Sequence, residues 1–209
     1  EHIENFPGLK DGIVGFEYGL LLQEQAEASG AQMQMSEVSG VRLEDPFRVV
    51  ATYDGDLRAR AVIVTVGSTL RRLGVPGENE LNGRGVSYCA TCDGAFFSNQ
   101  VVGVVGGGDS ALDEAMTLTQ FASEVIILHR RDSLRGQQLL QDRVLSEPKV
   151  KLLWNTEVER VLGEDEVIGV STRDVVTGET SQVDLSGLFV YVGLEPNAAF
   201  LKELLPLDN

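Results

Sequence analysis

The chain has 209 residues, and 17 basic against 32 acidic residues give it a formal net charge of −15 at pH 7. Its 43% hydrophobic content is enough to bury a core, which excludes intrinsic disorder. Apolar runs such as 188–192 are far below the ~20 residues that cross a bilayer. The acidic excess argues against nucleic acid or an anionic membrane surface as a partner. Because no charged-then-apolar leader opens the chain, we expect a cytoplasmic protein.

The first third of the chain predicts one helix followed by strands. Apolar residues at helical spacing over 13–28 predict the helix, and Gly30 would end it. Strands are predicted over 31–35, 40–43, 47–53 and 57–66. Asp54-Gly55 is a hairpin turn between the last two. A connector rich in Gly and Pro over 74–85 follows, so we place a domain boundary near residues 70–75.

From residue 101 the pattern predicts strand–helix–strand units of the α/β class. The wholly apolar stretch 101–105 is typical of a buried parallel strand, and a helix over 109–121 follows it. The next strand is 124–128, and a helix over 135–145 would be N-capped by Asp132 or Ser133. Further strands are predicted over 150–154, 157–162, 167–175, 182–185 and 188–192.

A glycine turn separates the first of these strands from its helix. Gly106, Gly108 and Ala111 fit the pattern G-x-G-x-x-A, in which the glycines allow a tight turn and close approach of a pyrophosphate. The helix N-terminus then offers unpaired N–H groups to the phosphates. An ordinary turn is the alternative, but the position between a buried strand and a periodic helix favours dinucleotide binding. The predicted contacts are Gly106, Gly107, Gly108, Asp109, Ser110 and Ala111.

Basic residues follow the second strand of the unit, where an NAD site would have an acidic residue. The predicted contacts here are His129, Arg130, Arg131 and Arg135. Guanidinium groups match the oxygens of a 2′-phosphate bidentately, so the sequence favours NADPH over NADH. The alternative is a solvated cluster of surface charges.

The two cysteines of the chain, Cys89 and Cys92, are spaced for redox chemistry. On a helical turn their Cβ atoms would lie roughly 5–6 Å apart, from which a small adjustment closes a disulfide. Asp93 directly follows and is a candidate general acid. Two other interpretations stay open at this point. One is a zinc site, for which the chain offers few further ligands, and the other is a pair of inert core thiols.

In chain order, these motifs strongly resemble those of low-molecular-weight thioredoxin reductases. The resemblance rests on Cys89-Ala90-Thr91-Cys92-Asp93-Gly94, Gly106-Gly107-Gly108-Asp109-Ser110-Ala111, and His129-Arg130-Arg131-Asp132 with Arg135. Flanking segments are also similar: Glu4-Asn5-Phe6-Pro7-Gly8 to a stretch near the flavin, residues 71–78 to the entry into the nucleotide domain, and residues 187–193 to its exit. The resemblance adds Asn5, Val192 and Gly193 to the expected cofactor contacts.

The resemblance implies a flavoprotein with two dinucleotide-binding domains. Residues 1–71 would be a partial FAD domain, 72–196 an inserted NADPH domain with the cysteines, and 197–209 the return into the FAD domain. Electrons would pass from NADPH through FAD to the Cys89–Cys92 disulfide, with Cys92 facing the flavin, Cys89 attacking thioredoxin and Asp93 as the acid. The family is commonly homodimeric. A second glycine fingerprint for FAD is absent, so we expect a fragment that holds FAD weakly.

Two other functions remain open from the sequence. The disulfide partner could be a peroxiredoxin-type or glutaredoxin-like protein, because short motifs do not encode partner surfaces. The chain could also be a non-catalytic module that binds NADPH, although such a module has no need of the cysteine pair.

Overall fold

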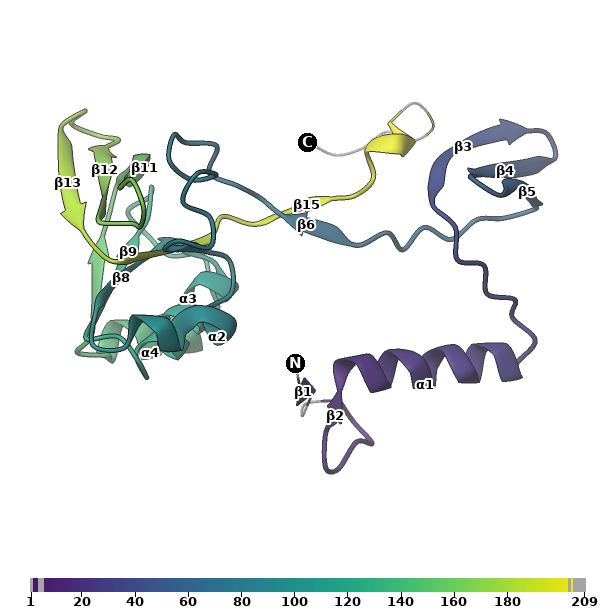
Figure 1. The fold of residues 1–209 in the computed structure, drawn as a ribbon, viewed down its shortest axis with the longest axis horizontal. Coiled ribbons are helices and arrows are strands. Elements are labelled where there is room, and N and C mark those ends of the chain that lie inside the picture. The colour runs from purple at the N-terminus through teal and green to yellow at the C-terminus, as the bar shows by residue number, and fades with distance from the viewer. Residues whose placement is uncertain (1, 4–5, 203, 205–209) are drawn as a thin grey trace. The chain divides into compact units, whose positions relative to one another are not determined.

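The computed structural model describes residues 2–3, 6–202 and 204. The chain forms two compact units, one of residues 1–64 with 198–209 and the other of residues 65–197 (Figure 1). The sequence places the domain boundaries after residues 71 and 196, whereas these units divide after residues 64 and 197. The assignment of each domain to a cofactor stays a prediction. Among the described residues no helix combines the length and the apolar character that crossing a membrane requires.

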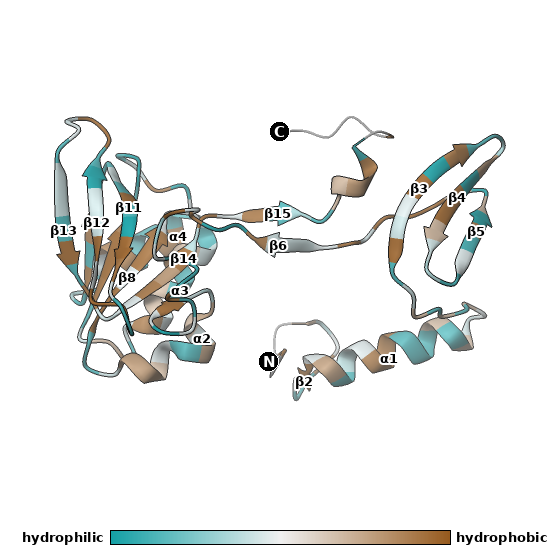
Figure 2. Ribbon diagram, turned by 45° about the horizontal axis from the view of Figure 1, so that its top comes forward, coloured by the Kyte–Doolittle hydropathy of each residue, from teal (hydrophilic) through white to brown (hydrophobic). Residues whose placement is uncertain are grey.

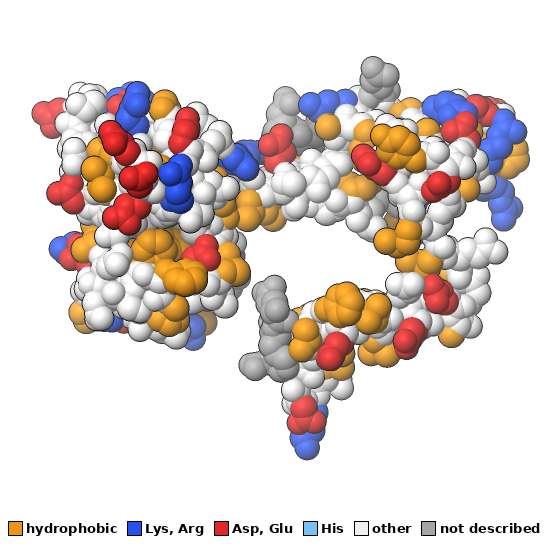
Figure 3. Space-filling model, in the orientation of Figure 1, with side chains coloured by type: hydrophobic (Ala, Val, Ile, Leu, Met, Phe, Trp, Pro, Cys, Tyr) orange, Lys and Arg blue, Asp and Glu red, His pale blue; other side chains and the backbone are white. Residues whose placement is uncertain are grey.

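The first unit contains one long helix and a small antiparallel sheet. Its elements are β1 (His2–Ile3), β2 (Ile13–Val14), α1 (Gly15–Ala28), β3 (Val38–Glu44), β4 (Phe47–Thr52), β5 (Gly55–Ala59) and the 3₁₀ helix η2 (Ala199–Leu201). The predicted helix is confirmed, and Gly30 follows it with a φ of +92°, a left-handed conformation that glycine adopts without strain. Hydrophobic side chains lie along the visible side of α1 (Figure 3). Phe16, at the start of α1, is 76% exposed.

Two predicted strands of this unit are wrong in whole or in part. Residues 31–35 are not a strand, because the structure pairs no other segment with them in the described part of the chain. The predicted strand 57–66 ends at Ala59, which pairs with Arg48 near the start of β4. The strand β4 begins at Phe47, just after the turn at Asp45-Pro46. The residues that follow Ala59 therefore have no part of β4 left to pair with. The hairpin is confirmed, but its two-residue loop is Tyr53-Asp54 and not Asp54-Gly55, because Gly55 already pairs with Thr52.

The second unit is built on a five-stranded parallel sheet. Its strands lie in the order β10 (Val150–Leu153), β9 (Glu124–Leu128), β8 (Val101–Gly106), β14 (Gly187–Tyr191) and β7 (Val86–Ser87). The central strands are almost continuously apolar (Figure 2), as expected when both faces of a sheet are covered. Helices α3 (Asp109–Leu118) and α4 (Gln138–Ser146) belong to this unit, as do the short α2 (Ala90–Asp93) and the 3₁₀ helix η1 (Gly94–Phe97).

Two apolar clusters lie on the two sides of this sheet. One joins buried residues of β8, β9 and β14 to α3 and α4, with Phe189 at its centre among side chains that are fully buried. The other joins the sheet to a three-stranded antiparallel sheet of β11 (Thr156–Leu162), β12 (Gly169–Asp174) and β13 (Thr180–Asp184). Strands β6 (Ser68–Leu70) and β15 (Leu194–Pro196) pair antiparallel at the ends of the unit. The unit is therefore a three-layer α/β structure.

Helix α4 begins later than the sequence predicts, at Gln138 rather than at 135, and neither Asp132 nor Ser133 caps it. The backbone N–H groups of Arg135 and Gly136 instead donate to the carbonyl oxygen of Gly107, at 2.7 and 3.1 Å. These bonds hold the chain against the glycine turn. Local helix propensity cannot reveal such long-range bonds, which explains the error.

A buried carboxylate fixes the segment that leads into the second unit. Glu78 is fully buried, and its two oxygens accept the N–H groups of Leu73 and Gly74 at 2.8 and 2.7 Å. The hydroxyl of Tyr88 donates to the same carboxylate at 2.8 Å. Burial and this hydrogen bond raise the pKa of Tyr88 to about 12. The buried carboxylate of Glu78 therefore serves as the acceptor for three hydrogen-bond donors of this segment.

We expect Glu78→Ala to lower the free energy of unfolding by about 3 kcal/mol, because it leaves three donors without their acceptor. Urea unfolding followed by the fluorescence of Trp154 would measure the change. Glu164→Ala, at an exposed position, is the control and should change stability by less than about 0.5 kcal/mol. Equal stability of the two variants would contradict the assignment.

Candidate functional site

The glycine turn lies at the carboxyl end of β8, the central strand of the five-stranded sheet. Gly106 has a φ of +150°, and a Cβ there would lie 2.5 Å from the carbonyl oxygen of Tyr191. A Cβ on Gly107 would meet the ring of His129 at 2.4 Å, whereas one on Gly108 would have no neighbour within 4 Å. Gly108 also precedes α3 as its N-cap. The backbone therefore leaves open space at a helix N-terminus, which suits an incoming phosphate.

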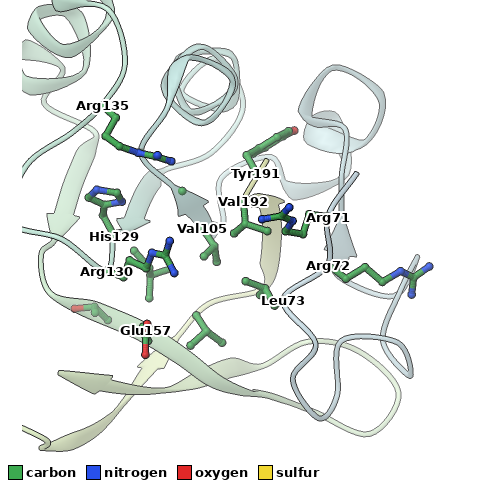
Figure 4. A pocket seen from close by; sticks show the side chains of 15 residues that line it. Arg71, Arg72, Leu73, Val105, His129, Arg130, Arg135, Glu157, Tyr191 and Val192 are labelled. Carbon is green, nitrogen blue, oxygen red and sulfur yellow. The ribbon is translucent and has the colours of Figure 1, made fainter. Parts of the chain in front are cut away.

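A cavity of about 410 Å³ opens beside this turn (Figure 4). Of the residues predicted to bind a cofactor, those that line it are Gly106, Gly107, His129, Arg130, Arg135 and Val192. The sequence interpretation did not include other lining residues, among them Arg71, Arg72, Thr156, Glu157, Val158 and Tyr191. Arginines from two distant segments, residues 71–72 and 130–135, therefore line one cavity.

Other predicted contacts do not line the cavity in this structure: Gly108, Asp109, Ser110, Ala111, Arg131 and Gly193. Asp109 is already engaged, since its carboxylate accepts the N–H of Gln137 at 2.6 Å, just before α4. Ala111 is buried and lies against Gly106. Asn5 lies outside the described residues. Whether these residues touch a ligand stays a prediction.

His129 lines the cavity as a buried side chain and contributes no positive charge to it. It is 5% exposed, one ring nitrogen lies 2.9 Å from the carbonyl oxygen of Ser133, and its ring meets Trp154 edge-on. Burial lowers the pKa of His129, and the charges of Arg135 and Arg131 lower it further against the opposing effect of two backbone carbonyls. A neutral imidazole near pH 7 leaves the arginines as the source of positive charge.

The cysteines form a disulfide at the start of α2, with Cα atoms 5.3 Å apart. Cys89 is the N-cap residue of α2, and the N–H of Cys92 donates to the Cys89 sulfur at 3.1 Å. Cys92 is exposed and Cys89 is half-buried. Within the part of the chain that the structure describes, no three His, Cys, Asp or Glu side chains are grouped so as to hold a metal ion.

Side chains outside the cysteines fix this disulfide turn. The hydroxyl of Ser87 donates to the carboxylate of Asp93 at 2.7 Å and accepts the N–H of Cys89 at 3.1 Å. Asp93 is thereby held beside the disulfide that it directly follows in the chain. The hydroxyl oxygen of Tyr191 accepts the N–H of Ala90 at 2.8 Å. The roles of Ser87 and Tyr191 were not identified from the sequence, because these roles depend on contacts and not on a motif.

Comparison with known proteins identifies the family. Residues 6–208 match the family described as pyridine nucleotide-disulphide oxidoreductase. The chain belongs to this family. Among curated members, thioredoxin reductase from Streptomyces clavuligerus is 47% identical over 99% of this chain, which spans 65% of the relative's length. A bifunctional thioredoxin reductase/thioredoxin from Mycobacterium leprae is 42% identical over 99% of this chain, which spans 45% of that protein.

A solved structure of a family member supports the same assignment. The thioredoxin reductase of Lactococcus lactis, in a structure described as the FR conformation, is 39% identical with a TM-score of 0.83. The match covers 97% of this chain and 67% of that one. The resemblance found in the motifs is therefore confirmed at the level of family and fold, and the chain spans about two thirds of such an oxidoreductase.

The lowered pKa of His129 predicts a pH dependence of stability. Below pH 6.5 the unfolded chain takes up a proton on this residue before the folded chain does. The free energy of unfolding should therefore fall as the pH drops from about 6.5 to 5.5. Urea unfolding at several pH values, followed by Trp154 fluorescence, would measure the fall. His129→Asn should reduce this slope, and an unchanged slope would contradict a buried neutral imidazole.

Proposed function

We propose that the complete protein is an NADPH-dependent flavoprotein disulfide reductase that passes electrons through Cys89–Cys92 to thioredoxin. One observation carries the proposal: a disulfide held beside a candidate acid lies in the same unit as an arginine-lined cavity at a strand–glycine–helix turn. The names of the curated relatives agree with this reaction.

The residues of the cavity fit NADPH. Phosphates would lie at the N-terminus of α3, where Gly108 leaves open space. Arg130 and Arg135 would bind the 2′-phosphate, because both line the cavity and a guanidinium group binds phosphate oxygens bidentately. We also assign Arg71, which comes from the entry segment of the unit, to the phosphates of the same ligand.

FAD is assigned to the complete protein and not to this chain alone. In the first unit, no glycine-rich turn joins a strand to a helix among the residues that the structure describes. The described part of that unit therefore does not fit FAD by itself. In the complete protein the flavin would supply the two-electron transfer between nicotinamide and disulfide.

The exchange with the partner uses this chain's own residues. Once the disulfide is reduced, the thiolate of Cys89 attacks one sulfur of the partner's disulfide, whose S–S bond breaks as a mixed disulfide forms. The thiolate of Cys92 then attacks the sulfur of Cys89, which restores the Cys89–Cys92 bond. The partner leaves with two electrons and two protons, and Asp93 donates one of these protons to a leaving thiolate.

An exposed aromatic side chain beside the disulfide favours a protein as the partner. Phe96 on η1 follows Cys92 by four residues and is 77% exposed. Exposed apolar patches commonly mark contact surfaces for proteins, and we propose that Phe96 and the exposed Cys92 belong to such a surface. We assign thioredoxin as this partner, with a peroxiredoxin-type or glutaredoxin-like protein as the alternative. A homodimer located in the cytoplasm completes the proposal.

NADPH oxidation by the complete, FAD-loaded protein tests this function. Oxidised thioredoxin should start the turnover, and Cys92→Ser should abolish it while NADPH still binds. Turnover retained in that variant would remove Cys92 from the reaction. Flavin reduction without thioredoxin-dependent turnover would keep the reductase chemistry and point to another disulfide partner.

Cofactor selectivity tests the cavity. Arg130→Ala and Arg135→Ala should each raise the Kd for NADPH by at least about tenfold, because each removes a charged hydrogen bond. The Kd for NADH should change by less than about threefold. Calorimetric titration would measure both values. Arg143→Ala, which removes an exposed charge near the end of α4, is the control. Equal weakening of NADPH and NADH would contradict the assignment of the 2′-phosphate.

A further inference from the structure

Tyr191 joins the cavity to the disulfide. It is the last residue of β14 and pairs in register with Gly106, the first residue of the glycine turn. Its side chain lines the cavity, with the hydroxyl on the side of the ring away from Arg130 (Figure 4). That hydroxyl oxygen accepts the N–H of Ala90, which lies 101 residues away in the chain. One side chain therefore contacts both features.

The hydrogen bond to Ala90 fixes the residue that follows Cys89. Ala90 is fully buried and is the first residue of α2. N–H groups in the first turn of a helix have no acceptor within the helix, and a buried one needs a partner from elsewhere. The N–H groups of Cys89 and Cys92 are satisfied inside the turn, by Ser87 and by the sulfur of Cys89. Tyr191 thus holds the turn from a distant part of the chain.

The hydroxyl of Tyr191 stays protonated over the physiological range. Burial raises the pKa of Tyr191, and the negative charges of Glu114 and Asp93 raise it further. A neutral phenol oxygen is a suitable acceptor for a backbone N–H. The Tyr191 oxygen therefore accepts the N–H of Ala90 as a neutral phenol.

We propose that Tyr191 is a positioning residue that couples occupancy of the arginine-lined cavity to the Cys89–Cys92 turn. A ligand that lies over Gly106 and Gly107 would contact the ring of Tyr191 and restrict its motion. The restricted ring holds Ala90 more firmly, so the disulfide opens more slowly to an external reductant while the cavity is filled. This coupling rests on the proposed function, because that function supplies the nucleotide as ligand.

Hydrogen exchange at the Ala90 amide tests the positioning role in the complete, FAD-loaded protein. Tyr191→Phe keeps the ring and removes the acceptor, so exchange should become about fivefold faster, the equivalent of one neutral hydrogen bond. NADP⁺ should slow this exchange severalfold in the wild type and leave it unchanged in the variant. Tyr88→Phe is the matched control: it removes a hydroxyl bonded to Glu78 and should not change exchange at Ala90.

The rate at which a phosphine, TCEP, reduces the disulfide tests the coupling without turnover. NADP⁺ should slow this reduction in the wild type by about two- to fivefold and should have no effect in Tyr191→Phe. Both proteins should bind NADP⁺ within about threefold of each other. If NADP⁺ binds but changes neither rate in the wild type, the coupling is wrong and the proposed function stands. If NADP⁺ does not bind the wild type, the nucleotide assignment and the coupling both fail.

Discussion

The close packing of backbone at Gly106–Gly108 is the constraint on which the candidate site depends. A side chain on Gly106 would collide with the backbone of β14, and one on Gly107 with the ring of His129. This close approach lets the carbonyl oxygen of Gly107 accept two N–H groups from the loop that carries Arg135. The turn therefore sets the start of α3, the path of the arginine loop and the position of β14 together. A substitution at either glycine would disturb all three.

The cavity concentrates positive charge in a chain that is acidic overall. The formal net charge is −15, yet Arg71, Arg72, Arg130 and Arg135 all line one cavity. His129, although it lies among them, is kept neutral by burial. A local field of this kind would select an anionic ligand by charge, while the negative surface elsewhere repels other polyanions. The selectivity therefore belongs to the cavity and not to the protein as a whole.

The accuracy of sequence-based prediction differed between the two units for a physical reason. In residues 65–197 the central strands β9, β8 and β14 each lie between two neighbours, so their hydrophobic runs predict them well. In the first unit, residues 31–35 have a strand-like composition but pair with no segment that the structure describes. Strand β5 ends at Ala59, where its partner strand β4 begins. A strand needs a partner, and the sequence of one segment does not contain that information. The late start of α4 has the same origin, since the loop before it is bonded to Gly107.

The sequence by itself determined the local chemistry: the glycine turn, the cysteine pair and the arginine cluster, because each is a short pattern whose geometry depends on neighbours in the chain. The tertiary structure alone decided which of these groups meet. It brought Arg71 into the cavity, buried His129 and Glu78, and set the hydroxyl of Tyr191 on Ala90 across 101 residues. Burial and long-range hydrogen bonds arise from the packing of whole layers. No local pattern encodes them.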